Sequence, residues 1–242
     1  MRLLVLPEVT GTAAENMATD LLLLERASAP GVLWFRHYGW SEPAFTFGVS
    51  QSREAVRAVA GPGPVLVRRP TGGGVVSHLN DWTYALVAPS GHRLSEARAT
   101  ESYHAVHAAL ARALAQAGVP AVLVPCPRET CGVGSGGTAP VAPGPGVCFV
   151  RPEIYDVVRA DDGRKLAGAA QKRTREGILF QGSVDRAACG AIDWDAFRAV
   201  LLAELERVGE GVAEPAAFPG FPERAACEAL ARFGSDAWNA RR

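Results

Sequence analysis

The sequence has 242 residues and no net charge, because 25 Lys and Arg side chains balance 25 Asp and Glu side chains. This length allows one large domain or two small ones, and a hydrophobic content of 48% allows a substantial core. The zero net charge indicates no general surface for nucleic acid or anionic membranes. The N-terminal residues are too soon broken by proline for a signal peptide, and no apolar stretch approaches the ~20 residues of a membrane span. We therefore expect a cytoplasmic protein that binds neither nucleic acid nor membrane.

The first part of the chain is expected to contain four strands and two helices. Residues 2–6 predict a short strand, and Thr12 with Glu15 forms a capping box that opens a helix to about Ala27. Strands follow at residues 32–38 and 44–49, then a short helix at 53–59 and a strand that leads to Arg68.

A glycine-rich segment comes next, RRPTGGGVVSH from Arg68 to His78. Three consecutive glycines weaken a sheet, so such a run is tolerated where something must approach the backbone closely. The two arginines indicate an anion, since a guanidinium group matches phosphate or carboxylate. The segment fits neither a Walker A loop nor the dinucleotide fingerprint. The alternative is a glycine-rich hairpin with solvated arginines.

The second half continues with helices and strands that do not alternate strictly. We expect a long helix with Ser95 as its N-cap and Gly118 after its end, on which His104 and His107 are structural or exposed. A strand at 121–124 precedes residues 125–147, whose 11 Gly or Pro predict a lid, a binding loop or disorder. Strands at 154–159, 164–171 and 177–184, a helix capped by Asp193, a linker at 214–222 and a helix at 223–233 complete an α+β protein.

Two further residues are candidates for chemistry. Lys165 stands where a run of small residues begins, so it could be a fixed cation or hydrogen-bond donor, or simply a solvated lysine on an edge strand. Cys148 follows the Gly- and Pro-rich loop, so it could be a nucleophile, or a small buried hydrophobe. Five cysteines without a C-x-x-C pair support neither a zinc site nor a disulfide scaffold.

These segments together carry a family resemblance. The stretch RRPTGGGVVSH resembles the Arg-Arg-x-x-Gly-Gly-Gly-x-x-x-His segment of the lipoate–protein ligase, octanoyltransferase and biotin ligase superfamily. The stretch KLAGAAQ from Lys165 resembles its lysine segment, and residues 15–20, 45–51 and 237–242 fit as well. The resemblance implies one domain over residues 1–242, with a mixed, mostly antiparallel sheet flanked by helices and no separate C-terminal accessory domain.

The pair Cys148-Phe149 resembles the cysteine-dependent octanoyltransferase branch. This resemblance implies that Cys148 attacks an octanoyl or lipoyl thioester, that Lys165 assists, and that no metal or other cofactor is needed. It implies octanoyl–acyl carrier protein as donor and a lipoyl-domain protein as acceptor, such as glycine cleavage H protein or a 2-oxoacid dehydrogenase E2. The implied substrate-binding residues are Arg68, Arg69, Gly72, Gly73, Gly74, His78, Gly168, Ala169 and Ala170.

Two other functions stay open at this point. An ATP-dependent lipoate ligase would use Mg²⁺ and place Arg68 or Arg69 on the adenylate phosphate, whereas in a transferase these arginines serve docking or structure. A catalytically idle lipoyl-domain-binding or ligand-sensing protein is the second alternative. The family often has Asp directly after the histidine, where this sequence has Leu79, and His-Gly where this sequence has Gln181-Gly182. If those acidic and imidazole groups assist the chemistry of the family, His78 or Asp81 must substitute for them here, or the roles are absent.

Overall fold

Two β-sheets form the framework of the part of the chain that the computed structural model describes, residues 1–125 and 152–241. The order across the large sheet is β12 (Val212–Pro215), β1 (Arg2–Val5), β3 (Val32–Trp40), β7 (Asp81–Pro89), β11 (Gly177–Asp185), β10 (Lys165–Thr174), β9 (Val157–Arg159) and β8 (Ala121–Leu123), with β2 (Val9–Gly11) paired to β3. The small sheet consists of β5 (Val65–Arg68), β4 (Ala44–Phe47) and β6 (Val75–Ser77). Both sheets mix parallel and antiparallel pairs.

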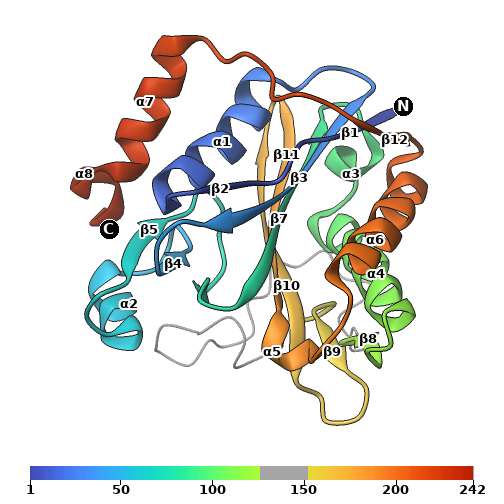
Figure 1. Ribbon diagram of the computed structural model, residues 1–242. Coiled ribbons are helices and arrows are strands. Elements are labelled where there is room, and N and C mark those ends of the chain that lie inside the picture. The colour runs from blue at the N-terminus through green and yellow to red at the C-terminus, as the bar shows by residue number, and fades with distance from the viewer. Residues whose placement is uncertain (126–151, 242) are drawn as a thin grey trace.

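Helices cover both faces of the large sheet (Figure 1). The long helices α4 and α6 pack together on one face, α1 covers the other, and α7 lies against α1. The helices are α1 (Ala13–Arg26), α2 (Arg53–Ala60), α3 (Arg93–Glu96), α4 (Ala99–Gln116), α5 (Arg186–Cys189), α6 (Trp194–Gly209), α7 (Glu223–Gly234) and α8 (Asp236–Asn239). The predicted α+β class, with a mixed sheet flanked by helices, is confirmed.

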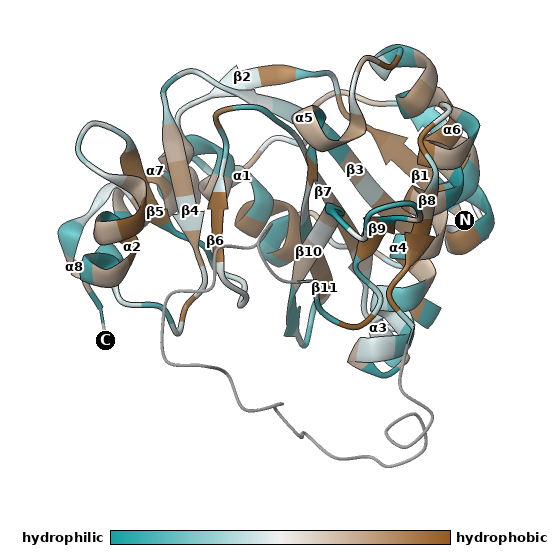
Figure 2. Ribbon diagram, turned by 90° about the horizontal axis from the view of Figure 1, so that it is seen from below, coloured by the Kyte–Doolittle hydropathy of each residue, from teal (hydrophilic) through white to brown (hydrophobic). Residues whose placement is uncertain are grey.

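Alternation along the central strand β7 explains why helices are needed on both faces. Trp82, Tyr84 and Leu86 join the core under α4 and α6, whereas Ala85 and Val87 join the core under α1. All five are buried, and each large apolar side chain contributes about 1.5–3 kcal/mol of burial free energy. In Figure 2, brown hydrophobic segments lie on strands of both sheets, such as β1 and β6.

The helix termini follow the local sequence signals in most cases. Thr12 and Glu15 form the predicted capping box of α1, and Asp193 caps α6 through its side chain. Gly118 after α4 has a φ of +87°, a conformation that suits glycine. His104 is exposed and His107 is buried, within the range predicted for them.

The predicted N-cap at Ser95 is wrong. Ser95 lies inside the short helix α3, and its hydroxyl donates to the carbonyl oxygens of Pro89 and His92. Extended backbone at Ala97 and Arg98 separates α3 from α4, which begins at Ala99. One predicted helix is therefore two.

Short strands account for the other differences. The strand predicted at 154–159 begins only at Val157, because Tyr155 has a φ of 66° and Asp156 closes a turn by accepting from the Glu153 amide. The predicted linker at 214–222 contains the end of β12, which pairs in parallel with β1. Most of the predicted loop at 125–147 lies outside the described residues. That residues 1–242 form one domain without an accessory domain stays a prediction.

Candidate active site

The glycine-rich segment and the lysine segment meet at a narrow pocket between the two sheets. The small sheet contributes one wall, and β10 and β11 contribute the other. The cavity is about 30 Å³, roughly the space of one water molecule. Its lining residues are Met17, Tyr38, Thr46, Arg69, Gly73, Val76, His78, Thr83, Gly168, Ala169, Ala170, Gln181, Gly182 and Ser183.

The close approach predicted for the glycine run is made by the chain itself. A Cβ atom added at Gly48 would lie 2.2 Å from the Gly73 carbonyl oxygen and 2.6 Å from the Gly72 carbonyl carbon. Gly73 has a φ of +83° and faces Ala170 across the pocket. Glycine is therefore required where β4 ends and at the middle of the run, because a side chain fits neither position.

Arg69 holds this glycine segment in place. Its Nη2 donates to the carbonyl oxygens of Gly72 (2.8 Å) and Gly74 (2.9 Å), and its Nη1 donates to the Thr46 hydroxyl (2.9 Å). The side chain is buried, so these charge-assisted hydrogen bonds replace the water that a guanidinium group would otherwise keep. Arg69 thereby shapes the pocket wall that it also lines.

Arg68 points elsewhere, toward the C-terminal segment. Its guanidinium group donates to the carbonyl oxygens of Val49 (2.6 Å), Trp238 (3.2 Å) and Arg241, and it lies 4.9 Å from the Phe47 ring centroid. In return the Trp238 indole donates to the Arg68 carbonyl oxygen at 2.9 Å. Arg68 thus fastens the end of the chain to the small sheet.

His78 belongs to a buried polar cluster at one end of the pocket. Its Nδ1 lies 2.8 Å from Asp81 Oδ2, and its Nε2 lies 2.7 Å from the Thr46 hydroxyl. Burial by itself would raise the pKa of the Asp81 carboxyl, but His78 and the hydroxyl groups of Ser183 and Thr83 outweigh burial and lower that pKa. The Asp81 carboxylate therefore fixes the imidazole ring of His78.

Gln181 links the pocket to a second buried network. Its Oε1 accepts from the Thr71 hydroxyl (2.8 Å), and its Nε2 donates to Asp20 Oδ2 (2.7 Å). Asp20 also pairs with Arg36 at 3.2 Å and accepts from the Tyr38 hydroxyl. Burial raises the pKa of the Asp20 carboxyl, against the opposing effects of Arg36, Gln181 and Tyr38. This network ties α1, β3 and β11 to the glycine-rich segment.

Lys165 lies at the start of β10, beside the small residues. Its Nζ pairs with Asp156 Oδ2 at 2.6 Å, and both side chains are almost fully buried, at 4% and 1% exposure. A Cβ atom at Gly168 would lie 2.9 Å from Lys165 Nζ and 3.1 Å from Asp156 Oδ1. Gly168 therefore leaves the space in which the lysine reaches the pocket wall. The alternative of a solvated lysine is wrong.

The structure brings most of the predicted site residues together. Arg69, Gly73, His78, Gly168, Ala169 and Ala170 line the pocket, Lys165 adjoins Gly168, and the carbonyl groups of Gly72 and Gly74 accept from Arg69. Cys148 lies outside the described residues.

Sequence reasoning missed Asp156, the partner of Lys165. One signal was available for the lysine itself: the chain has only two lysines, Lys165 and Lys172, and uses arginine everywhere else. A lysine kept in such a chain indicates a place that a guanidinium group cannot fill. Asp156 gives no comparable signal, because only the turn at 153–156 directs it toward the lysine.

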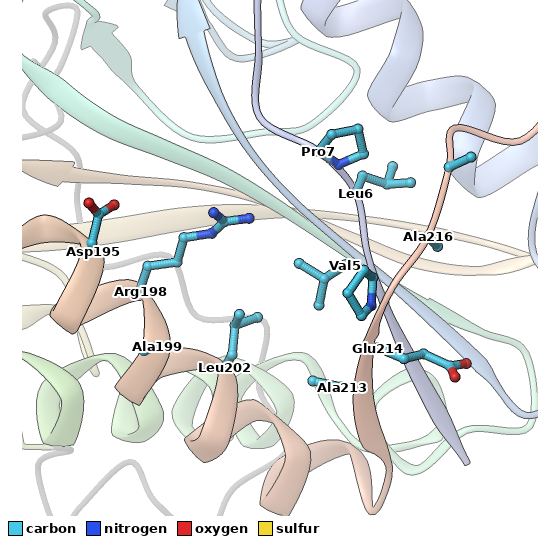
Figure 3. Close-up of a pocket in the computed structure, with 12 residues that line it drawn as sticks. Val5, Leu6, Pro7, Asp195, Arg198, Ala199, Leu202, Ala213, Glu214 and Ala216 are labelled. Atoms are coloured by element: carbon cyan, nitrogen blue, oxygen red, sulfur yellow. The ribbon is translucent and has the colours of Figure 1, made fainter.

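A larger cavity of about 690 Å³ lies away from this site, between α6 and the strands β1 and β12 (Figure 3). Apolar residues such as Val5, Leu6 and Leu202 line it, with Arg198 and Glu214 among them. It contains none of the predicted site residues. The larger cavity is therefore separate from the pocket that the glycine-rich and lysine segments form.

Within residues 1–125 and 152–241, no cluster of three or more His, Cys, Asp or Glu side chains could hold a metal ion. No helix in the described part of the chain is long and apolar enough to cross a membrane.

Comparison with solved structures identifies the fold. The protein superposes on Ta0514, a putative lipoate protein ligase from T. acidophilum with bound lipoic acid, with a TM-score of 0.73 and 18% identity over 98% of this chain and 97% of that chain. It superposes on lipoate-protein ligase A bound with ATP with a TM-score of 0.71 and 17% identity, over 99% and 98% of the two chains. The protein has the fold of a lipoate ligase catalytic domain.

The family follows from the sequence comparisons. The lipoyl protein ligase A/B catalytic domain matches residues 12–207, and the chain belongs to this family. It is 35% identical to octanoyltransferase LipM of Kyrpidia tusciae over 180 residues, 72% of this chain and 62% of the relative. It is 33% identical to octanoyltransferase LipM of Symbiobacterium thermophilum over 82% of this chain and 67% of the relative. The matched region spans about three fifths of the length of the first curated relatives.

Proposed function

We propose that this protein is an octanoyltransferase, which moves an octanoyl group from the thioester of acyl carrier protein to a lysine of a lipoyl-domain protein. The observation that carries the proposal is the buried Lys165 at the wall of a pocket that both family segments form. Relatives named octanoyltransferase support the choice of acyl group. The proposed reaction needs neither ATP nor a metal ion, and the protein that accepts the octanoyl group is the glycine cleavage H protein or a 2-oxoacid dehydrogenase E2 subunit.

The reaction proceeds in two transfers. The Cys148 thiol gives up its proton and its thiolate attacks the octanoyl carbonyl, the bond to the carrier sulfur breaks, and the carrier leaves as a thiol that takes up one proton in exchange. The acceptor lysine amine then attacks the acyl-enzyme, an amide bond forms, and Cys148 recovers its proton as the thiol. Cys148 enters this scheme through its sequence resemblance.

Lys165 is the proposed electrophilic partner of both transfers. An ammonium group near the acyl carbonyl stabilises the oxyanion of each tetrahedral intermediate. Backbone amides near Gly73 and Gly74 are proposed as further donors. Such preorganised donors are worth about 3–4 kcal/mol each when a transition state develops charge.

The pocket between the sheets is the proposed acyl site. Each buried methylene of an octanoyl chain contributes about 0.8 kcal/mol, which gives several kcal/mol for the whole tail. The cavity of about 30 Å³ is too small for eight carbons, so the lining must yield. Met17 suits this need, because an unbranched thioether side chain changes rotamer easily. Its Sδ accepts one hydrogen bond from Gln181 Nε2, at 3.2 Å.

The contacts of the arginine pair favour this proposal over an ATP-dependent ligase. Arg68 donates to carbonyl oxygens of the C-terminal segment, and Arg69 donates to the glycine-rich segment. Both guanidinium groups are thus engaged with protein oxygen atoms rather than presented to a phosphate.

The test is to incubate the protein with octanoyl–acyl carrier protein and measure its intact mass. We expect one octanoyl adduct that neutral hydroxylamine removes, as a thioester requires, and that the Cys148→Ala variant lacks. Cys227→Ser is the matched control, because Cys227 is an exposed cysteine on α7, and its adduct should equal that of the wild type. Transfer to an apo lipoyl domain should then follow from the isolated acyl-enzyme.

Two results would count against the proposal. An adduct that survives in Cys148→Ala removes the cysteine from the mechanism. No adduct, together with an acyl-adenylate formed from octanoate, ATP and Mg²⁺, makes the protein a ligase.

A further inference from the structure

A tyrosine on α4 connects the catalytic lysine to the strand that lines the pocket. The Tyr103 hydroxyl donates to Asp156 Oδ1 at 2.6 Å and accepts from the backbone amide of Ala169 at 3.2 Å. Asp156 Oδ2 in turn pairs with Lys165 Nζ at 2.6 Å. The Tyr103 hydroxyl therefore donates a hydrogen bond to the partner of Lys165 and accepts one from the strand that lines the pocket.

Burial makes this chain of contacts restrictive. Asp156 is 0% exposed, and its carboxylate also accepts from the Glu153 amide at 2.7 Å. Both of its oxygen atoms are therefore engaged, and the carboxylate is fixed in rotation as well as position. Separating a buried charge from its partner is costly, so the position of Asp156 fixes the position of the Lys165 ammonium group.

The tyrosine is itself fixed by its neighbours on α4. Its ring lies 3.8 Å from the His107 ring, centroid to centroid, and His107 Nδ1 donates to the Tyr155 carbonyl oxygen at 2.8 Å. The helix thereby holds both Tyr103 and the turn that carries Asp156. Helix α4 and the turn at 153–156 therefore both hold groups that fix the Lys165 side chain of β10.

We propose that Tyr103 and Asp156 are positioning residues for Lys165, and that Tyr103 keeps the ammonium group in register with the Gly168–Ala170 wall. A free lysine side chain samples many rotamers, and only a few place its Nζ beside an acyl carbonyl. The two contacts of Tyr103 select such a rotamer and set the wall against it. This inference rests on the proposed function for the role of Lys165, but not for the geometry.

The first experiment is a double-mutant cycle on octanoyl transfer. Tyr103→Phe keeps the ring and removes the hydroxyl, and we expect kcat to fall about 10-fold, the equivalent of one hydrogen bond, with KM nearly unchanged. In a Lys165→Met background the same substitution should lower the residual rate no further, because Tyr103 acts through the lysine. An equal fall in both backgrounds would overturn the proposal, since it would show a role independent of Lys165.

The second experiment measures the lysine directly and does not depend on the reaction. The chain has two lysines, so reductive methylation followed by peptide mass spectrometry gives separate rates for Lys165 and Lys172. We expect Tyr103→Phe and Asp156→Asn to raise the Lys165 rate several-fold while the Lys172 rate stays constant. Unchanged Lys165 rates in both variants would overturn the proposal even if octanoyl transfer is confirmed.

Tyr84→Phe is the matched control. Tyr84 is a buried tyrosine of β7 whose hydroxyl has no hydrogen-bond partner within residues 1–125 and 152–241, so its removal should alter neither the rate of transfer nor the labelling. If the wild type transfers no octanoyl group, the proposed function fails, and the labelling rates still decide the positioning role. If Tyr103→Phe does not fold, Asp156→Asn carries both experiments.

Discussion

Arg68 and Arg69 are adjacent in sequence, yet their side chains have separate tasks. Successive residues of an extended segment point to opposite sides, so one guanidinium group reaches the C-terminal segment and the other reaches the glycine-rich segment. The anion that the pair indicates from sequence is replaced in both cases by carbonyl oxygens of the protein. At this scale, residue type alone does not separate a ligand contact from a structural one.

A conservative substitution of Arg68 tests this distinction. Arg68→Lys keeps the charge but cannot reproduce a planar set of donors to Val49, Trp238 and Arg241. We expect a loss of about 2 kcal/mol of stability, or roughly 5 °C in Tm, with kcat/KM of the folded enzyme almost unchanged. Thermal unfolding and steady-state kinetics measure the two effects. A normal Tm with a large rise in KM would instead make Arg68 a substrate contact.

Arg53→Lys is the control for that comparison. Arg53 also donates to the C-terminal region, through Asp236, but its side chain is 36% exposed and that of Asp236 is 88% exposed. Exposed ion pairs of this kind contribute at most about 1 kcal/mol, so the Tm should stay close to that of the wild type.

At the scale of elements, the pocket depends on two backbones in direct contact. Gly48→Ala would place a methyl group 2.2 Å from the Gly73 carbonyl oxygen, so β4 and the glycine-rich segment would have to separate. We expect a loss of about 3 kcal/mol or more in denaturant unfolding, and loss of octanoyl transfer. Gly72→Ala is the stability control, because an added Cβ there meets nothing within 4 Å. Similar stabilities for the two variants would show that the contact at Gly48 is not required.

Local patterns predicted the elements well where the signal is contained in the element. The Thr12–Glu15 box and the Asp193 cap each act within a few residues, and the structure confirms them. The strand β12 was missed because its strand pairing comes from β1, more than two hundred residues earlier.

The candidate site shows the same division. The glycine-rich and lysine segments could be recognised because each carries its chemistry in a short stretch. Asp156 and Tyr103 could not, because their roles depend on partners from distant elements, such as Lys165 and the Ala169 amide. The sequence pattern therefore predicts the candidate reactive groups, whereas the residues that hold them in position are found only in the tertiary structure.

At the scale of the whole molecule, the packing of helices onto the sheet buries several ionisable groups. Burial lowers the pKa of His37 and His92, and it lowers the pKa of His107 to about 4. In His107 the contacts with Asp156 and the Tyr155 carbonyl act in the opposite direction but do not offset burial. These histidines are neutral in the folded protein at pH values where the unfolded chain binds protons.

This difference predicts that acid destabilises the protein well above the range of its carboxyl groups. An unfolded histidine gains a proton below about pH 6.5, whereas His107 stays neutral to about pH 4, so its contribution to stability is lost as the pH falls between these values. From about pH 7.5 to about pH 5 we expect a loss of about 2 kcal/mol from His107 alone, with smaller losses from His37 and His92. Asp20 acts in the opposite sense, because its raised pKa makes the folded state bind a proton first. Guanidinium unfolding at several pH values measures how the free energy of unfolding changes with pH.

The variant His107→Gln retains a donor for the Tyr155 carbonyl oxygen but does not titrate. We expect it to reduce the loss of unfolding free energy by about 2 kcal/mol over this pH range. An unchanged loss would show that the acid sensitivity comes from other groups.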